Sequence, residues 1–569
     1  MSFTADRRAR VVIFSGPRAT IQNSAALRTS QSVRRTRGLA GADPAAPESL
    51  RSQQLAAPVT AYVAAFSAHP LERDAAELYG PVDGWLDPVS GEFLDAAEAE
   101  GDDDATRPDG WTPVYRVTLD PADGPYPLPY AATQANGEPW NGPFDDAGNA
   151  RQLFYPDASR IVREIDHFGL DGYGGNNLLG SLADFDFVRA APSGGYTKGQ
   201  PAAERTDTPT PAGHRGEPGD LAPEVLGENF FPYMPMRQEP ALPTLATLTN
   251  IVYDTLAEGD YDGAIWLEGS PTTEETVYWF NLLIPTRRPL IGNCSQYGHG
   301  VFGNDGDHNL VQSTAYIASR VWADANGDDR VGTVMIQNGQ VFTSREVQKA
   351  DARPGGYIAY GGHGGIVGNT VEDPVLSFVP VARHTHTSAL TLDTLPTSVP
   401  GIHGSPVETV DGEGHLLPGA LPKVTIARYV NYGQDDFSDS ADSEVEILAR
   451  IAKNLRDHPL SGIVAEGSAP YGGVYESMRA ALLQAVFRGM PVVAVGRGGG
   501  GYAFGQSTMG GLLVRGSNLS APKARILLMA SLLKFGALPV PGDPDAPTAT
   551  ELDAIRSKVA EYQLVFDTH

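Results

Sequence analysis

Residues 262–283 read DGAIWLEGSPTTEETVYWFNLL, and this stretch decides the fold. Its first part is a short apolar run between glycines, which predicts a buried strand. Its second part has the length and apolar content of a helix. Between the two, Ser270 and Pro271 are residue types preferred at a helix N-cap and at the first helical position. The stretch therefore predicts a strand that delivers its next residues to the carboxyl edge of a sheet, followed by a helix.

The same alternation continues outward from this stretch. Predicted helices at 245–258 and 309–324 alternate with predicted strands at 289–293 and 332–339. Three further predicted strands, VTIARYV, GIVAEG and PVVAVG, alternate with three helices nearer the C-terminus. Regular alternation of strand and helix indicates an α/β fold with a doubly wound, mostly parallel sheet. We expect an N-terminal α/β domain at 1–395 and a smaller α/β domain at 421–569, joined by a Pro/Gly-rich linker at 396–420.

The N-terminal part of the chain differs from the rest in composition and periodicity. Residues 11–15, VVIFS, predict a buried strand that ends at Gly16. From about residue 30 to 165 the sequence turns to Pro, Gly, Asp and Ala without a sustained period, and a second loop-like stretch follows at about 193–225. We interpret the first as a large insertion and the second as a long loop.

Charge and cysteine content exclude several classes of protein. The formal net charge is −27, which disfavours binding to nucleic acid or to an anionic membrane surface. The single cysteine, Cys294, excludes an internal disulfide framework and a multi-thiolate metal site. No stretch approaches about 18 uninterrupted apolar residues, so we predict a soluble protein and expect it in the cytoplasm.

Four segments, in this order, are similar to text shared by the L-asparaginase/glutaminase family. They are SGPRATIQN (15–23), the opening stretch at 262–283, GNDGDHNL (303–310) with VMIQNGQVFTSREVQK (334–349), and GSNLSAPKARILLM (516–529). The resemblance covers roughly 11–23 and 230–535. It implies an asparaginase-like α/β fold and hydrolysis of an amide without a cofactor.

The resemblance also implies roles for individual residues. Thr20 occupies the position of the attacking hydroxyl, Ser270 that of the second hydroxyl, and Lys349 that of the lysine that adjusts proton transfer. Which of Thr20 and Ser270 attacks stays open. Backbone N–H groups around Gly269 and Ser270 are expected to stabilise the oxyanion, as at other helix N-termini. Without the resemblance, Lys349 would be interpreted as an exposed, solvated charge.

This sequence differs from the family at positions that bind the substrate in family members. The family Asp that holds a substrate α-amino group is Pro271 here, and the family His two positions before Ser270 is Glu268. Glu268 is a possible replacement carboxylate, and Thr272 aligns with the family text. The residues that grip the substrate carboxylate have no clean counterpart, although Arg237 or Gln238 is suited to that role. Gly473 falls near the family's intersubunit Asn.

Metal and dinucleotide sites are not favoured. The HTHT run at 384–387 offers two imidazoles but no further ligands in the expected order, and 324–332 lacks the bidentate Glu of a calcium loop. The glycine runs at 361–365 and 496–501 lack the spacing of a dinucleotide-binding motif. We predict no metal and no cofactor.

Three hypotheses follow. The first is an amidohydrolase that cleaves a small-molecule amide or cyclic amide through an acyl intermediate on Thr20, without strict preference for L-Asn. The second is an L-asparaginase or glutaminase, and the third is a non-catalytic ligand-binding or scaffold protein of the same fold. The resemblance also implies a homodimer or homotetramer with sites near the subunit interface.

Overall fold

The structure is a computed structural model. It describes residues 8–16, 28–30, 50–52, 59–64, 84–87, 92–96, 111–119, 153–154, 165, 179–189, 242–297, 303–360, 364–430, 440–498 and 509–569. Thr20, Arg237 and Gln238 lie outside the described residues.

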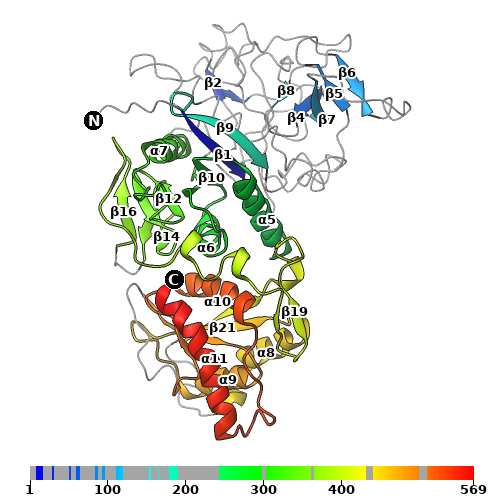
Figure 1. The fold of residues 1–569 in the computed structure, drawn as a ribbon, viewed down its shortest axis with the longest axis vertical. Coiled ribbons are helices and arrows are strands. Elements are labelled where there is room, and N and C mark those ends of the chain that lie inside the picture. Colours follow the sequence, from blue (N-terminus) through cyan, green and yellow to red (C-terminus); the bar gives the residue numbers. More distant parts are fainter. Residues whose placement is uncertain are drawn as a thin grey trace. The chain divides into compact units, whose positions relative to one another are not determined.

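The chain divides into two compact units, each built from more than one stretch of sequence; the helices and strands are labelled in Figure 1. The first consists of Met1–Glu239, Ala264–Ser270 and Asn293–Thr314, and the second of Pro240–Gly263, Pro271–Gly292 and Ala315–His569. The predicted linker at 396–420 lies within the second unit. The domain limits that we predict on either side of it stay a prediction.

A buried strand near the N-terminus organises the sheet of the first unit. The strands are, in order across the sheet, β10 (Gly263–Leu267), β1 (Ala9–Ser15) and β9 (Ala183–Arg189). β1 and β9 are parallel, and the side chains of residues 11–14 are fully buried. Such burial is expected of a parallel strand covered on both faces. The predicted strand at 11–15 is confirmed, whereas β9 lies outside the predicted strands.

The predicted insertion contains strands of its own. A five-stranded sheet has the order β6 (Phe93–Asp95), β5 (Gly84–Leu86), β7 (Thr112–Leu119), β4 (Val59–Ala64) and β8 (Leu153–Phe154). A separate pair joins β2 (Arg28–Ser30) to β3 (Leu50–Ser52). The pairings β4 with β7, β7 with β5 and β5 with β6 are antiparallel. This sheet is thus mostly antiparallel, whereas β1 and β9 are parallel.

The second unit begins with the predicted alternation of helix and strand. Its first elements are α5 (Leu242–Glu258), α6 (Thr273–Leu283), β11 (Leu290–Asn293), β12 (Val334–Gln337), β13 (Gln340–Thr343), β16 (Ile366–Asn369) and β17 (Val375–Leu376). Helix α7 (Gly306–Ser319) stands between β11 and β12 in the chain. The strands from β11 to β17 lie side by side in that order, and β11 is parallel to β12. These helices and strands confirm the α/β prediction.

Antiparallel strands form the outer part of this sheet. β12 and β13 are joined by Asn338 and Gly339, both with positive φ, 48° and 79°. An Asn-Gly pair in this conformation makes a tight hairpin turn. A second hairpin pairs β14 (Val347–Lys349) with β15 (Tyr357–Ala359). Both hairpins were outside the predicted parallel alternation, and the second one carries Lys349.

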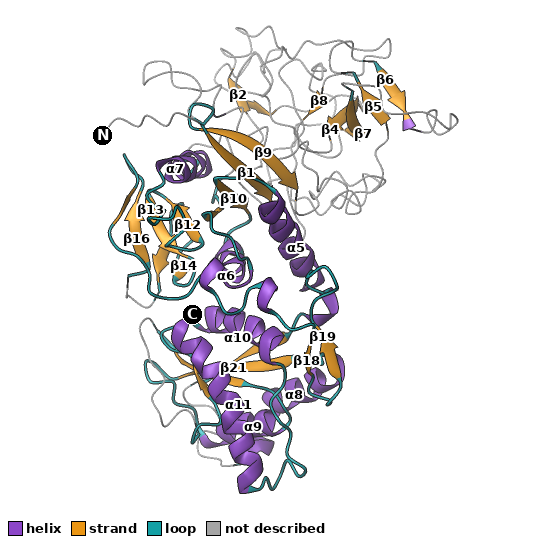
Figure 2. Cartoon of the chain, viewed as in Figure 1, coloured by secondary structure: helices purple, strands orange, loops and turns teal. Residues whose placement is uncertain are grey.

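The C-terminal part of the second unit is a parallel four-stranded sheet surrounded by helices (Figure 2). Its strands, in order, are β20 (Lys423–Arg428), β21 (Ser461–Gly467), β22 (Val492–Gly496) and β23 (Val514–Arg515). The helices are α8 (Val445–Asp457), α9 (Glu476–Phe487), α10 (Ala521–Phe535) and α11 (Ala549–Thr568). A small hairpin, β18 (Ser398–Pro400) with β19 (Pro406–Glu408), precedes them. Four short 3-10 helices complete the described part, at Thr385–Thr387, Leu392–Thr394, Pro418–Ala420 and Ala441–Ser443.

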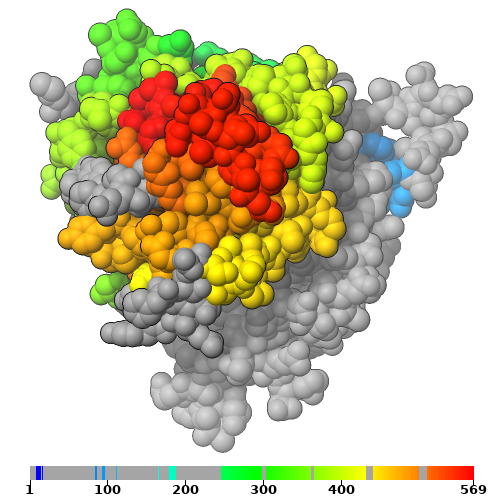
Figure 3. Space-filling model, turned by 90° about the horizontal axis from the view of Figure 1, so that it is seen from below, coloured from blue at the N-terminus to red at the C-terminus, as the bar shows by residue number. Residues whose placement is uncertain are grey.

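Helix α11 is an addition to the predicted elements. Thr548 and Glu551 form a capping box at its start, in which each side chain binds the other residue's backbone N–H. Tyr562 and Phe566 are buried, whereas Leu564 is 67% exposed. Figure 3 shows the atoms of α11, in red, on the outside of this part of the unit. One face of the helix therefore packs against the C-terminal core and the other faces solvent.

Candidate active site

The carboxyl end of β10 carries the predicted site residues Glu268, Gly269 and Ser270. The carboxylate of Glu268 accepts a hydrogen bond of 2.8 Å from Nε1 of Trp266 and is only 1% exposed. The backbone N–H of Glu268 donates to the carbonyl oxygen of Asn293 over 3.2 Å. Gly269 is buried and Ser270 is half-buried. Glu268 is therefore a fixed, buried acid with a neutral indole as a donor.

The carboxyl end of β1 lies directly beside the end of β10. The backbone N–H of Gly16 donates to the carbonyl oxygen of Leu267 over 2.8 Å. A Cβ atom at Gly16 would lie 2.5 Å from that oxygen and 2.6 Å from the ring of Trp266, so only glycine fits this approach. The chain thus leaves β1 within hydrogen-bond distance of the residue before Glu268. Thr20 follows four positions later, outside the described residues.

Amide side chains support the end of β11 in the same unit. Asn293 is fully buried and donates from Nδ2 to the hydroxyl of Ser313 over 2.9 Å. Asn309, also fully buried, donates from Nδ2 to the carbonyl oxygen of Cys294 over 3.1 Å. Asn309 belongs to the GNDGDHNL segment, whose similarity to the family text was the available signal, although neither Asn was among the predicted site residues. Asn309 thus fixes the backbone just after β11, and Asn293 joins the end of β11 to a side chain of α7.

Helix α6 begins within three residues of Ser270. It starts at Thr273, and Thr272, already in helical conformation at φ −57° and ψ −36°, holds the N-cap position. The carbonyl oxygen of Thr272 accepts the N–H groups of Glu275 and Thr276 over 3.0 and 3.2 Å. The predicted helix is confirmed, with its first residue two positions later than Pro271. The side chain of Thr272 makes no capping hydrogen bond within the described part of the chain.

Lys349 occupies the last position of strand β14. Its Nζ donates to the carbonyl oxygen of Arg353 over 2.8 Å and lies 4.7 Å from the ring centre of Tyr357. Its backbone N–H donates to Oε2 of Glu274 over 2.5 Å. A carbonyl oxygen and an aromatic face are both partners of an ammonium group. The lysine backbone is thus tied to the first turn of α6 through Glu274.

Two buried ionisable residues near Lys349, Glu274 and Lys523, are linked through the backbone carbonyl oxygen of Glu274. Lys523 of α10 is 2% exposed, and its Nζ donates to the carbonyl oxygen of Ser344 over 2.7 Å and to the carbonyl oxygen of Glu274. The same ammonium lies 5.5 Å from the ring centre of Tyr278. Lys523 therefore connects the C-terminal helix α10 to α6 and to the segment that leads to Lys349. It stands in the family-like GSNLSAPKARILLM segment, but it was not predicted as a site residue.

Burial shifts both members of this pair toward their neutral forms. It raises the pKa of Glu274 to about 7, although the charge of Lys523 and the N–H of Lys349 act in the opposite direction. Burial likewise lowers the pKa of Lys523 to about 8, against the attraction of Glu274 and Glu275. Burial thus acts on both groups in the direction that favours the neutral form, while each charge favours the other.

The predicted site residues fall into three sets. Glu268, Gly269 and Ser270 belong to the first unit, and Thr272 and Lys349 to the second. Thr20, Arg237 and Gln238 lie outside the described residues. The structure thus supplies the local surroundings of five predicted residues. Their roles stay predictions.

The motifs that we set aside have structural explanations. His384 and His386 meet edge to face with ring centres 5.8 Å apart, and burial lowers the pKa of His384 to about 4. The carboxylate of Asp329, in the predicted polar turn, accepts the N–H groups of Val331 and Gly332. Over the described ranges, no group of three or more His, Cys, Asp or Glu side chains is arranged to hold a metal ion.

Comparison with known proteins gives one matching family. Residues 239–356 match the family described as Asparaginase, N-terminal. None of the helices in the described ranges is long and apolar enough to span a membrane.

Individual relatives match parts of the chain. An L-asparaginase of Bacillus licheniformis is 30% identical over 27% of this chain and 45% of its own length. A glutaminase-asparaginase of Acinetobacter glutaminasificans is 25% identical over 31% and 50%, and L-asparaginase 2 of Bacillus subtilis (strain 168) is 25% identical over 51% and 66%. The chain thus spans about half the length of the first two. A crystal structure of a probable cytoplasmic L-asparaginase from Campylobacter jejuni covers 68% of this chain and 90% of its own, with 18% identity and a TM-score of 0.44.

Proposed function

We propose that this chain, which matches the asparaginase family over residues 239–356, is an amidohydrolase that cleaves a small-molecule amide. The finer proposal is that a threonine hydroxyl, that of Thr20, attacks the amide carbonyl and forms an acyl intermediate. Ammonia or an amine leaves, and water then hydrolyses the ester. No cofactor takes part in this scheme.

The proposal rests on the carboxyl ends of strands β1 and β10, which lie side by side. The hydrogen bond from Gly16 to Leu267 brings the chain that leads to Thr20 beside the chain that leads to Ser270. Ligands of open α/β sheets bind at the carboxyl ends of the strands. Two hydroxyl residues that follow adjacent strand ends are therefore suited to act on one bound amide.

The proposed role of each residue follows from the chemistry of its functional group. Thr20 supplies the nucleophile and Ser270 relays the proton that the nucleophile gives up. Lys349 supplies an amine that adjusts this proton transfer, which requires it to leave Arg353 or to exchange that partner for the relay hydroxyl. Backbone N–H groups at Gly269 and Ser270 stabilise the oxyanion.

The substrate proposal rests on Pro271 and Glu268. Proline has no side-chain acceptor for a substrate ammonium group, and Pro271 stands where the family text has Asp. The carboxylate of Glu268 is 1% exposed and already accepts from Trp266, so it is poorly available as a replacement. We therefore propose an amide or cyclic amide without a free α-amino group. Arg237 and Gln238 remain proposed ligands for a substrate carboxylate.

A panel of amides tests the activity. Purified full-length protein is incubated with L-Asn, L-Gln, their N-acyl derivatives, simple aliphatic amides and small lactams, and ammonia or ring-opened product is measured. We expect turnover of at least one compound that lacks an α-amino group, with L-Asn turned over at least about tenfold more slowly in kcat/KM, equal to about 1.4 kcal/mol.

Single variants test the mechanism. Thr20→Ala is expected to lower kcat by about 10³-fold or more, since it removes the nucleophile, while KM changes little. Thr29→Ala serves as the matched control because it changes a threonine outside the proposed site. Unchanged turnover in Thr20→Ala would show that Thr20 is not the nucleophile, and Ser270→Ala would then be the next variant to measure.

Two alternatives have their own signatures. The names of the relatives favour L-asparaginase or glutaminase activity, and rapid release of ammonia from L-Asn or L-Gln would establish it against our substrate proposal. A non-catalytic ligand-binding or scaffold protein is the third possibility. Hydrolysis of any amide that depends on Thr20 or Ser270 rules it out.

A further inference from the structure

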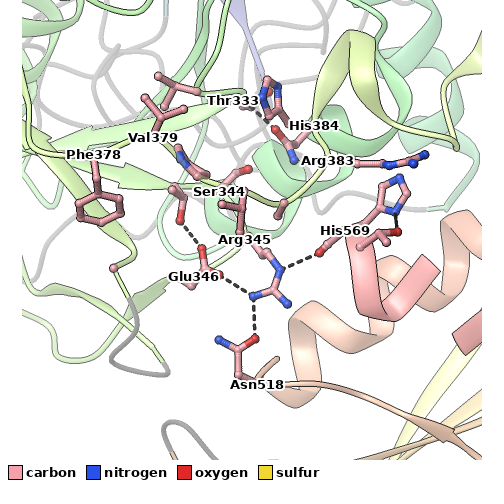
Figure 4. A pocket seen from close by; sticks show the side chains of 18 of the residues that line it. Thr333, Ser344, Arg345, Glu346, Phe378, Val379, Arg383, His384, Asn518 and His569 are labelled. Carbon is pink, nitrogen blue, oxygen red and sulfur yellow. Dashed lines mark hydrogen bonds and ion pairs between the residues drawn. The ribbon is translucent and has the colours of Figure 1, made fainter. Parts of the chain in front are cut away.

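A cavity in the second unit has no part in the proposed reaction. Its volume is about 510 Å³, within the range of roughly 300–1,000 Å³ usual for small-molecule sites. The wall is formed by residues near the ends of β12 and β13, by the segment 378–384 and by the C-terminal end of α11. Figure 4 shows labelled side chains that line it. Lys349 is not among the lining residues.

Two buried hydroxyl groups line this cavity without a hydrogen-bond partner. Thr333 and Ser344 are each 1% exposed, and neither Oγ1 of Thr333 nor Oγ of Ser344 has a partner among the described residues. Their backbone groups are satisfied, since the N–H of Thr333 donates to Asn281 and that of Ser344 to the carbonyl oxygen of Thr333. Buried polar groups in folded proteins normally have partners. The two hydroxyls therefore keep unused hydrogen-bonding capacity in the wall of the cavity.

Arg345 is held rigidly in the same wall. Its Nε donates to the carbonyl oxygen of His569 over 2.7 Å, and its Nη1 donates to Glu346 over 2.5 Å and to Asn518 over 2.8 Å, as drawn in Figure 4. Nη2 makes no hydrogen bond with the residues that the structure describes. Because three partners fix the plane of the guanidinium, the remaining nitrogen is a preorganised donor.

The charged side chains of the cavity wall are two arginines, Arg345 and Arg383, and two acids, Glu346 and Asp567. Glu346 is paired with Arg345, and Asp567 lies 3.9 Å from Arg515 outside the cavity wall. Arg383 is exposed and has no ion-pair or hydrogen-bond partner for its side chain in the described part of the chain. Burial lowers the pKa of His384 to about 4, so this imidazole is neutral at pH 7 and adds no charge. Arg383 therefore supplies a cation with which an anionic ligand can pair.

Apolar side chains form another part of the wall. Phe378 is 42% exposed and Val381 is fully exposed, and Val379 and Pro380 stand between them in the chain. A large exposed aromatic ring beside a polar cavity is typical of a ligand site. The lining thus combines donors at one part with an apolar surface at another.

We propose that this cavity binds a small organic carboxylate with an aromatic or aliphatic body. The carboxylate would accept hydrogen bonds from Ser344, Thr333 and Nη2 of Arg345, with Arg383 neutralising its charge, and the body would lie against Phe378. The proposal is independent of the amidohydrolase assignment.

Titration calorimetry of the full chain tests the proposal. The probes are benzoate, phenylacetate and glutarate, with inorganic phosphate as the alternative oxyanion and benzyl alcohol as the neutral counterpart of benzoate. We expect saturable binding of at least one organic carboxylate at one molecule per chain. Phosphate and benzyl alcohol should bind at least about tenfold more weakly, since each lacks the apolar body or the charge.

Variants locate the bound carboxylate. Arg383→Gln is expected to weaken binding about tenfold and Ser344→Ala about fivefold, the usual range for one charged and one neutral hydrogen bond. Both variants should fold, because neither side chain has a partner to lose. Arg456→Gln, at the end of α8 and outside the cavity, and Thr20→Ala should bind as the unaltered chain does.

Several results would overturn the proposal. They are the absence of saturable binding by all three carboxylates, binding that Arg383→Gln and Ser344→Ala leave unchanged, and binding that Thr20→Ala abolishes. Phosphate binding as tight as that of the best carboxylate would also reject the organic ligand class.

Discussion

Glu268 and Glu274 are both buried acids close in sequence to proposed catalytic residues, and they are held in different ways. Glu268, two positions before Ser270, has a neutral indole as a donor. Glu274 accepts the backbone N–H of Lys349 and lies next to the buried ammonium of Lys523. The first acid is fixed by a neighbour two residues away in the chain. The second lies next to a cation on a helix near the other end of the sequence, so the surroundings of Lys349 include a contact with α10.

Removal of the distant cation is expected to have the largest effect. Lys523→Met leaves Glu274 buried without its charged partner and leaves the carbonyl oxygen of Ser344 without its donor. We expect a loss of about 3 kcal/mol in local unfolding free energy, because two buried carbonyl oxygens lose hydrogen bonds from a charged donor. Native-state hydrogen exchange of the amides in α10 measures this loss.

Two further variants make that measurement decisive. Lys453→Met changes an exposed lysine of α8 and should alter exchange by less than about 0.5 kcal/mol. Lys523→Met combined with Glu274→Gln should recover part of the loss, since a neutral amide needs no cation. If Lys523→Met exchanges like the unaltered chain, the hydrogen bonds of Lys523 do not hold α10.

Removal of the neutral donor is expected to cost less. Trp266→Phe deprives the Glu268 carboxylate of its indole N–H, with an expected loss of about 2 kcal/mol in unfolding free energy. Trp322→Phe is the matched control, because its indole donates to an uncharged carbonyl oxygen, that of Ile317, over 3.0 Å. Hydrogen bonds to charged groups are worth more, so Trp266→Phe should be the more destabilising by about 1 kcal/mol in urea unfolding. Equal losses would mean that the hydrogen bond to Glu268 is no stronger than a bond to a neutral acceptor.

The pH dependence of stability separates the two acids further. The folded pKa of Glu274 is raised from 4.5 to about 7, so the folded state keeps a proton that the unfolded state releases in this window. The stability contribution of Glu274 therefore falls as pH rises from 4.5 to 7, by at most about 1.4 kcal/mol per pH unit. Urea unfolding of Glu274→Gln between pH 4.5 and 7 should lack this fall. A slope equal to that of the unaltered chain would contradict the assignment.

An exposed acid gives the smallest expected effect. Glu551 accepts the N–H groups of Gly542 and Thr548, and these bonds lower its pKa to about 2. Thr548→Ala removes one half of the capping box and should speed hydrogen exchange only in the first turn of α11. Thr568→Ala, at the other end of the helix, should leave that turn unchanged. Faster exchange throughout α11 would show that the cap holds the whole helix.

Local patterns predicted the elements that carry Ser270 and failed for those that carry Lys349. The strand β10 and the helix α6 follow from one continuous stretch, because apolar runs and cap residues act over a few positions. The hairpin of β14 and β15 depends on pairing between Lys349 and Tyr357 across a turn. The Asn338-Gly339 turn was a readable signal, but the surrounding residues also fit a continuing parallel strand.

The role of Lys523 was beyond sequence reasoning for a different reason. Lysine is rarely buried, so a lysine in a helical segment is normally interpreted as a solvated charge. Its burial depends on Glu274, Ser344 and Tyr278, which are remote in the chain and come together only in the fold. The family-like text around Lys523 marked the segment without indicating a task for this residue.

The hydrogen bond from Lys523 to Ser344 limits where the chain can be truncated. The segment that matches the asparaginase family ends at residue 356 and contains Glu274 and Ser344, whereas the ammonium that binds their carbonyl oxygens stands on α10. A fragment cut at that limit would expose an apolar face of α6 and leave an acid and two carbonyl oxygens without their ammonium. The recognisable portion of the sequence is thus not an autonomous module, and recombinant or evolutionary shuffling of it would have to carry α10 along.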